Sequence, residues 1–69
     1  MIQITLRDEF IKLGQALKAA NLCESGVDAK YAIQDGQVQV NGEVETRRGR
    51  KLFAGDTVVF QGETIRISE

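Results

Sequence analysis

The first residues of the chain alternate between apolar and polar side chains. Ile2, Ile4 and Leu6 are each followed by a polar residue, a period of two that is typical of a half-buried β-strand. From residue 9 to about residue 20 the apolar spacing lengthens to three and four, which predicts a helix with Asp8 as its N-cap. The apolar stripe of this helix consists of Phe10, Leu13, Leu17 and Ala20. The chain is therefore expected to begin with a short strand and to continue into a helix.

A second helix is predicted shortly after the first. Residues 21–24 interrupt the apolar pattern, and Ser25, followed three positions later by Asp28, resembles a capping box closed by an aspartate. Gly36 is the expected stop of this helix. Its apolar side consists of Ala29, Ala32 and Ile33, and Tyr31 lies on the opposite side. We therefore expect two short helices joined by a tight turn.

Short strands are predicted after Gly36. Val38 and Val40 alternate with glutamines and lead into Asn41-Gly42, a dipeptide that favours a hairpin turn. Residues 43–46 are the expected return strand, and two further strands are expected at 57–60 and 64–67. Because no repeat, linker or low-complexity run interrupts the pattern, we expect residues 1–69 to form one domain.

The composition excludes several classes of function. A chain of 69 residues is too small to enclose a drug-sized pocket, so function is expected on the surface. The absence of histidine excludes the usual serine and cysteine triads and all histidine-ligated metal sites. The lone cysteine, Cys23, has no disulfide partner and is expected to be buried. Since no glycine-rich phosphate motif is present either, we expect neither an enzyme nor a bound metal or cofactor.

The N-terminus gives no sign of targeting. It lacks the basic start and apolar run of a signal peptide, and no stretch approaches the roughly 20 apolar residues that span a bilayer. The expectation is therefore a complete, soluble, cytoplasmic protein that does not contact membranes.

The distribution of basic residues is the main anomaly of the sequence. Four of the nine basic residues lie within residues 47–51, so this segment carries a charge of +4. The remaining 64 residues carry −5, and the two parts together give the net charge of −1. Gly49 interrupts the segment and lets a partner approach the backbone, while guanidinium groups match phosphate oxygens. Lys12, Lys18 and Lys30 extend the patch if the helices pack beside it. The competing interpretation is a solvated loop without a ligand.

The aromatic residues decide which nucleic acid suits this patch. Phe10, Phe53 and Phe60 occupy apolar positions typical of a core, which leaves Tyr31 as the one expected exposed ring. Single-strand binders stack successive bases on exposed aromatic rings, whereas folded RNA is held through phosphates, 2′-hydroxyls and shape. Structured RNA is therefore favoured. A further pair of acidic residues, Glu43 and Glu45, is expected to form only a polar strand edge.

Two stretches carry a resemblance to a known family. Residues 25–30 match the pattern Ser-x-x-x-Ala-Arg/Lys, and residues 33–42 match Ile-x-x-Gly-x-Val-x-Val-Asn-Gly. Together they resemble the RNA-binding domain named for small-subunit ribosomal protein four. Residues 12–18, 45–51 and 54–56 look like the stand-alone bacterial, YbcJ/YaaA-like branch of that family, so the resemblance covers nearly the whole chain.

The resemblance implies a fold and a binding surface. The fold is α+β, of the alpha-L type: two short helices packed on a small, bent, antiparallel or mixed sheet with a short N-terminal strand. RNA is expected against the helices and the adjoining loop. In many relatives an arginine follows the helix-opening serine, and Gly26 at this place removes one phosphate contact. The expected RNA-binding residues are Lys12, Lys18, Ser25, Lys30, Asn41, Arg47, Arg48, Arg50 and Lys51.

The resulting hypothesis is a monomeric, non-enzymatic protein that binds structured RNA, either ribosomal RNA or another folded RNA. With roughly five phosphate contacts, the plot of log affinity against log salt is expected to have a slope of about −4. The alternative is a protein-interaction adaptor that docks a protein partner through the basic loop at residues 47–51 or adds a strand at a sheet edge.

Overall fold

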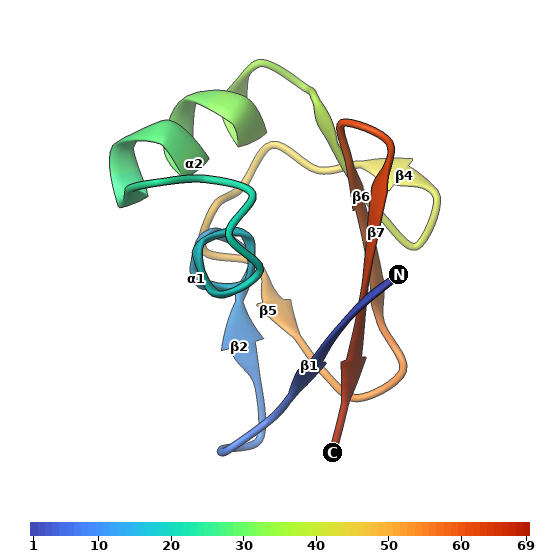
Figure 1. Cartoon of the computed structure of the whole chain (residues 1–69). Coiled ribbons are helices and arrows are strands. Elements are labelled where there is room, and N and C mark those ends of the chain that lie inside the picture. The colour runs from blue at the N-terminus through green and yellow to red at the C-terminus, as the bar shows by residue number, and fades with distance from the viewer.

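The computed structural model describes all residues from 1 to 69 and contains two helices and seven short strands (Figure 1). In chain order the elements are β1 (Ile2–Thr5), β2 (Ile11–Lys12), α1 (Leu13–Ala19), α2 (Gly26–Gln34), β3 (Val38–Val40), β4 (Glu43–Val44), β5 (Lys51–Leu52), β6 (Thr57–Phe60) and β7 (Glu63–Ser68). The predicted second helix, hairpin and terminal strands are confirmed, with ends that differ by at most two residues. Neither helix has the length and apolar character needed to cross a membrane.

The second helix begins where its cap predicts. The Ser25 hydroxyl accepts a hydrogen bond from the backbone N–H of Asp28 at 3.2 Å, which satisfies one free amide of the first turn. The helix buries Ala29, Ala32 and Ile33 and leaves Tyr31 exposed, as the periodicity predicts. Local sequence is therefore sufficient to specify α2.

The prediction that the first helix begins at Asp8 was wrong, because α1 begins only at Leu13. Ile11 pairs instead with Leu52 in the two-stranded β2–β5 ribbon. The first amides of α1 are satisfied by a distant loop: Leu13 N–H donates to the Arg50 carbonyl at 2.8 Å, and Gly14 N–H to the Arg48 carbonyl at 3.0 Å. These long-range bonds, together with a local bond from the Lys12 N–H to Gln15 Oε1 at 3.4 Å, cap the helix in place of Asp8.

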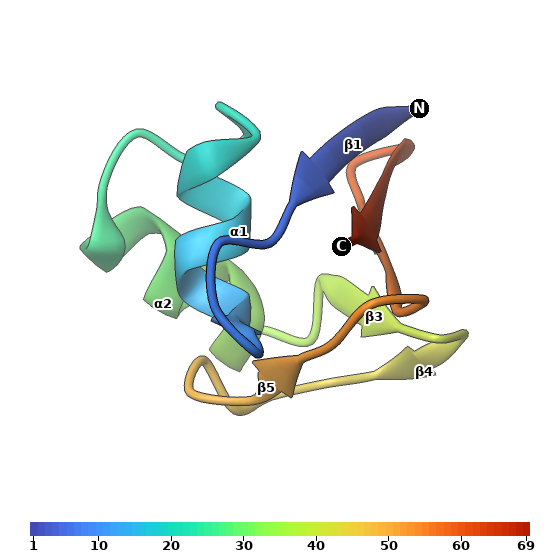
Figure 2. The same cartoon turned by 90° about the horizontal axis from the view of Figure 1, so that it is seen from below.

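The larger sheet is mixed and has the order β1-β7-β6-β3-β4. β1 runs parallel to β7, with Ile2 opposite Ile65, and the remaining neighbours are antiparallel. Both helices lie on the same side of this sheet (Figure 2). This arrangement is the α+β architecture that the resemblance implies, including the short N-terminal strand.

The hydrophobic core lies between the helices and the sheet. Leu13, Leu17 and Ile33 from the helices are completely buried, each contributing about 1.5–3 kcal/mol through loss of water contact. The buried strand residues are Val38, Val40, Leu52, Val58, Phe60, Ile65 and Ile67. The expected core position of Phe53 was wrong: its side chain is 48% exposed and its ring centroid lies 6.1 Å from that of half-buried Phe10. Phe53 follows β5, where the chain leaves the ribbon.

The Asn41-Gly42 turn supports a testable prediction about stability. Asn41 has a φ of 53°, its amide donates to Asp56 at 3.1 Å, and its Oδ1 accepts from the Thr57 N–H at 3.0 Å. We expect Asn41→Ala to lower the free energy of unfolding by about 1–2 kcal/mol, because the side-chain hydrogen bonds to Asp56 and Thr57 are lost. Thermal and urea unfolding measure the effect.

Gln61 offers the matched control for this prediction. It occupies the β6–β7 turn with a φ of 52° and makes no side-chain hydrogen bond. Gln61→Ala therefore changes a residue of similar backbone conformation without breaking a bond and is expected to cost much less. Equal losses for the two substitutions would contradict the role assigned to the Asn41 amide.

Candidate functional site

One hollow on the surface is lined by basic and small polar residues alone. It contains three cationic side chains and neither an acidic nor an apolar one. We call it the basic hollow; it is lined by Lys12, Gly14, Gln15, Lys18, Gly26, Arg48 and Gly49. No cation of the basic hollow takes part in an ion pair. Such a surface favours an anionic ligand with several negative charges.

The hollow is assembled from three separate segments: residues 12–18, the basic loop (residues 45–50 in the structure) and the start of α2 at Gly26. Gln15 and Lys18 lie three residues apart on α1 and share a face of the helix, and Lys12 immediately precedes α1 as its N-cap residue. The loop 45–50 is held against the start of α1 by the backbone bonds that its carbonyls accept from Leu13 and Gly14. The structure thus brings Lys12 and Lys18 together with Arg48.

Two glycines leave part of the hollow open. A Cβ atom on Gly26 or on Gly49 would meet no heavy atom within 4 Å, and neither residue has the positive φ that demands glycine. The fold therefore does not require glycine at these positions. Gly26 leaves room for a larger side chain at the start of α2, whereas Gly49 bares the backbone of the basic loop to a ligand.

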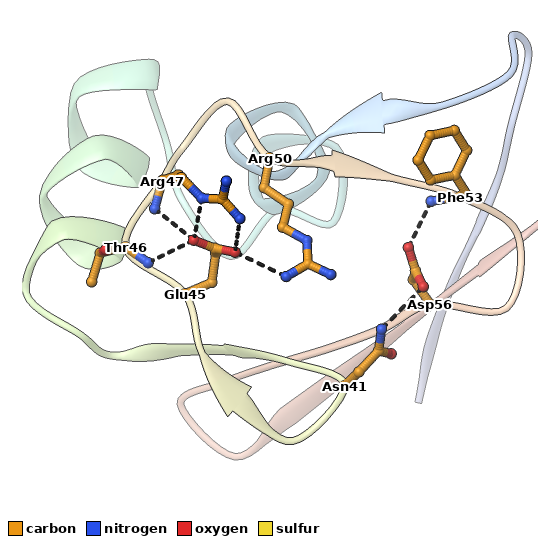
Figure 3. A network of polar contacts seen from close by, with 7 residues as sticks. All are labelled: Asn41, Glu45, Thr46, Arg47, Arg50, Phe53 and Asp56. Atoms are coloured by element: carbon orange, nitrogen blue, oxygen red, sulfur yellow. Dashed lines mark hydrogen bonds and ion pairs between the residues drawn. The ribbon is translucent and has the colours of Figure 1, made fainter.

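A buried carboxylate organises the basic loop. Glu45 is only 7% exposed, and its two oxygens accept five hydrogen bonds (Figure 3). Arg47 contributes Nε at 3.0 Å and Nη2 at 3.1 Å, Arg50 contributes Nη1 at 2.9 Å, and the amides of Thr46 and Arg47 donate at 3.1 Å. The expectation that Glu45 forms a polar strand edge with Glu43 was therefore wrong.

These contacts set the charge state of the loop. The hydrogen bonds from Arg47 and then Arg50 outweigh desolvation and lower the pKa of Glu45 to about 2, so the carboxylate is ionised at neutral pH. The same pairing raises the pKa of Arg47. Arg47 and Arg50 are consequently partnered inside the molecule, although the Arg47 side chain remains 74% exposed.

The two remaining basic residues of segment 47–51, Arg48 and Lys51, differ from this pair. Arg48 makes no side-chain contact with an acid and lines the basic hollow. The ammonium group of Lys51 lies 4.7 Å from the ring centroid of Phe10, a cation–π geometry. The four basic residues, which look equivalent in sequence, thus have three different surroundings.

The other predicted binding residues lie outside the basic hollow. Lys30 is half-buried on α2, the Ser25 hydroxyl caps that helix, and the Asn41 side chain bonds to Asp56 and Thr57. Their contact with RNA stays a prediction. Cys23 is half-buried, and desolvation together with the charge of Asp28 raises its thiol pKa.

Sequence reasoning missed several residues of this site. Gly14 and Gln15 belong to the hollow, and Gly26 was considered only for the arginine that it replaces. A signal existed for Gln15, which is spaced three residues from both Lys12 and Lys18. No local signal identifies Glu45 as buried, because it is charged and the arginines that pair with it follow it in the chain.

Comparison with known proteins places this architecture in a family. The S4 domain profile matches residues 4–68. A protein of Escherichia coli (strain K12) named "Putative RNA-binding protein YbcJ" is 46% identical over 57 residues, which are 83% of this chain and 81% of YbcJ. The solution structure of E. coli YbcJ superposes with a TM-score of 0.76 and 40% identity, covering 100% of this chain and 89% of that one. It is described as revealing an alpha-L motif involved in RNA-binding.

Two further proteins match most of this chain. A protein of Bacillus subtilis (strain 168) named "Probable ribosome maturation protein RlbA" is 46% identical over 59 residues, covering 86% of this chain and 83% of the relative. The tyrosine–tRNA ligase of Ralstonia nicotianae is 38% identical over 61 residues, which are 88% of this chain but only 16% of the ligase. These findings confirm the resemblance seen in residues 25–42. The chain belongs to the S4 domain family, with an alpha-L fold.

Proposed function

We propose that this protein binds structured RNA through the basic hollow and catalyses no reaction. The observation that carries the proposal is the convergence of Lys12, Lys18 and Arg48 on one hollow without an acidic residue. Unpaired cations on a surface attract phosphates, and the bared backbone at Gly49 lets a nucleic-acid backbone come close. The names of YbcJ and RlbA, which refer to RNA binding and to ribosome maturation, support the same conclusion.

The proposal assigns different roles within the basic loop. Arg48 contacts phosphate directly, together with Lys12 and Lys18. Arg47 and Arg50 hold the loop in shape through Glu45 and add a weaker attraction, since the carboxylate offsets part of their charge. Lys51, Lys30, Ser25 and Asn41 flank the hollow as secondary candidates.

The class of RNA follows from what lines the hollow. No aromatic side chain is among its residues, so it offers no ring on which successive unpaired bases could stack. Phosphate positions and groove shape are the remaining features to recognise, and these are defined only in a folded RNA. Ribosomal RNA, met in the cytoplasm, is the folded RNA that we propose. The net charge of −1 opposes indiscriminate binding to polyanions.

Fluorescence anisotropy with two RNAs of equal length and composition tests the proposal. One forms a stable hairpin, the other remains unpaired, and both are titrated over a salt series. We expect tighter binding of the hairpin and, for three direct phosphate contacts, a slope of log affinity against log salt of about −2 to −3. Equal affinity for both RNAs, or a slope near zero, would overturn it.

A gain-of-function substitution provides a sharper prediction at Gly26. Gly26→Arg restores the arginine of many relatives, and its side chain enters open space beside the basic hollow. We expect RNA affinity to rise about three- to tenfold, because a fourth cation contributes one more phosphate contact. Anisotropy titration with the hairpin RNA measures the change.

Two controls isolate the charge and its position. Gly26→Gln adds a comparable side chain without charge, and Gln39→Arg adds the same charge at an exposed position of β3 outside the hollow. Neither is expected to change the affinity more than about twofold. If Gln39→Arg strengthens binding as much as Gly26→Arg does, net charge rather than the hollow determines affinity.

A further inference from the structure

We propose that a second hollow, beside Phe53, docks an arginine-bearing segment of a protein partner. We call it the Phe53 hollow; it is lined by Leu6, Asp8, Glu9, Phe53, Ala54 and Glu69. Three lining residues are apolar (Leu6, Phe53 and Ala54) and three are acidic (Asp8, Glu9 and Glu69), so its charge is opposite to that of the basic hollow. The inference does not depend on the RNA proposal.

Backbone hydrogen bonds position two of the apolar lining residues, Phe53 and Leu6. Phe53 is 48% exposed although its ring packs against Phe10. Its N–H donates to Asp56 Oδ2 at 2.8 Å, which fixes the backbone at this point (Figure 3). Leu6 is placed beside the last strand because its N–H donates to the Ser68 carbonyl at 2.7 Å. An exposed aromatic ring on a preformed surface is a feature of protein-binding sites.

The three acidic lining residues determine which ligand suits the hollow. Asp8, Glu9 and Glu69 make no ion pair and no side-chain hydrogen bond with any residue of the chain, and no basic side chain lines the hollow. Three unpaired carboxylates repel phosphate, so RNA does not suit this surface.

An arginine side chain matches both features of the hollow. Its aliphatic stem covers Leu6 and Ala54, its planar guanidinium stacks on the Phe53 ring, and its N–H groups reach the carboxylates. Apolar residues that flank the arginine in the partner would cover the remaining exposed surface of the apolar lining residues. The occupant is therefore a protein segment in which arginine lies between apolar residues.

The two hollows can be occupied together. Their linings have no residue in common. A protein with both sites filled would hold a folded RNA at one surface and a basic protein segment at another. RNA-associated proteins commonly carry basic segments, which compensate phosphate charge.

Solution NMR with a defined peptide tests the inference. The full-length, ¹⁵N-labelled protein is titrated with acetyl-Leu-Arg-Leu-amide and, separately, with acetyl-Leu-Glu-Leu-amide. We expect the arginine peptide to cause saturable shifts of the Leu6, Asp8, Phe53 and Ala54 amides, and the glutamate peptide to cause none. The absence of saturable shifts at these amides up to about 10 mM arginine peptide overturns the proposal.

Matched variants and an RNA titration complete the test. The double variant Asp8→Asn/Glu9→Gln is expected to lower the affinity for the arginine peptide about fivefold. Glu43→Gln/Glu63→Gln removes the same charge from exposed positions elsewhere and is expected to leave this affinity unchanged. Equal weakening by both double variants would overturn the site. Hairpin RNA is expected to shift amides of the basic hollow only. If it shifts the Phe53 and Ala54 amides instead, RNA is the occupant and the proposal fails.

Discussion

Replacing both Lys18 and Arg48 with glutamine is expected to weaken binding of a hairpin RNA on the order of 10- to 30-fold near physiological salt. The two side chains reach the same hollow from α1 and from the basic loop, and neither is paired with an acid. Each phosphate that the variant no longer neutralises keeps its counterion when the RNA binds. The slope of log affinity against log salt should therefore become shallower by about 1.5.

The chain offers a control with the same change in net charge. Arg7 and Arg66 are exposed, lie outside the basic hollow and make no ion pair. Arg7→Gln/Arg66→Gln should therefore reduce affinity about twofold or less and leave the salt slope nearly unchanged. Anisotropy titrations at four or more salt concentrations separate the two double variants. Identical losses would show that the basic hollow is not the contact surface.

Glu45→Gln is expected to lower the free energy of unfolding by about 1–3 kcal/mol, or the Tm by roughly 10 °C. A glutamine retains one acceptor oxygen but loses the charge, and its amide nitrogen faces the donors that the carboxylate now satisfies. The substitution leaves Arg47 and Arg50 without their common partner. Because both residues lie in the loop that presents Arg48, affinity for the hairpin RNA should fall as well.

Glu43→Gln is the matched control for this substitution. Glu43 lies two residues earlier, is exposed and forms neither an ion pair nor a side-chain hydrogen bond. Its replacement should change stability by less than about 0.5 kcal/mol. Chemical denaturation at pH 7 compares the two variants. Indistinguishable stabilities would show that the Glu45 network contributes little.

The pH dependence of stability gives this prediction a second readout. The folded state lowers the pKa of Glu45 to about 2, whereas an unfolded glutamate titrates near 4.3. Between these values the unfolded state binds more protons, so stability falls as the pH decreases. The stability difference between the native protein and Glu45→Gln should therefore be constant above about pH 5 and shrink toward pH 2. A difference that does not change with pH would exclude the charged network as its cause.

Local sequence specifies those parts of this protein whose structure depends on residues close together in the chain. Ser25 and Asp28 set the start of α2 through one hydrogen bond across three residues, and Asn41-Gly42 sets the hairpin through left-handed backbone angles. The period-two strands were predicted for the same reason. The motifs of residues 25–42 also identified the family, because they specify those local structures together with a basic position on α2.

Other parts of the fold depend on packing, because long-range contacts there outweigh the local preference of the chain. α1 begins at Leu13 because β2 pairs with β5 and the basic loop caps the helix, which no pattern around Asp8 predicts. Phe53 is exposed because its neighbour Leu52 takes the core side of the chain at β5, which leaves Phe53 on the outer side. Glu45 is buried because two arginines that follow it fold back onto it. The sequence thus specified how many cations were available, and packing alone decided that Arg48, rather than Arg47 or Arg50, would join Lys12 and Lys18.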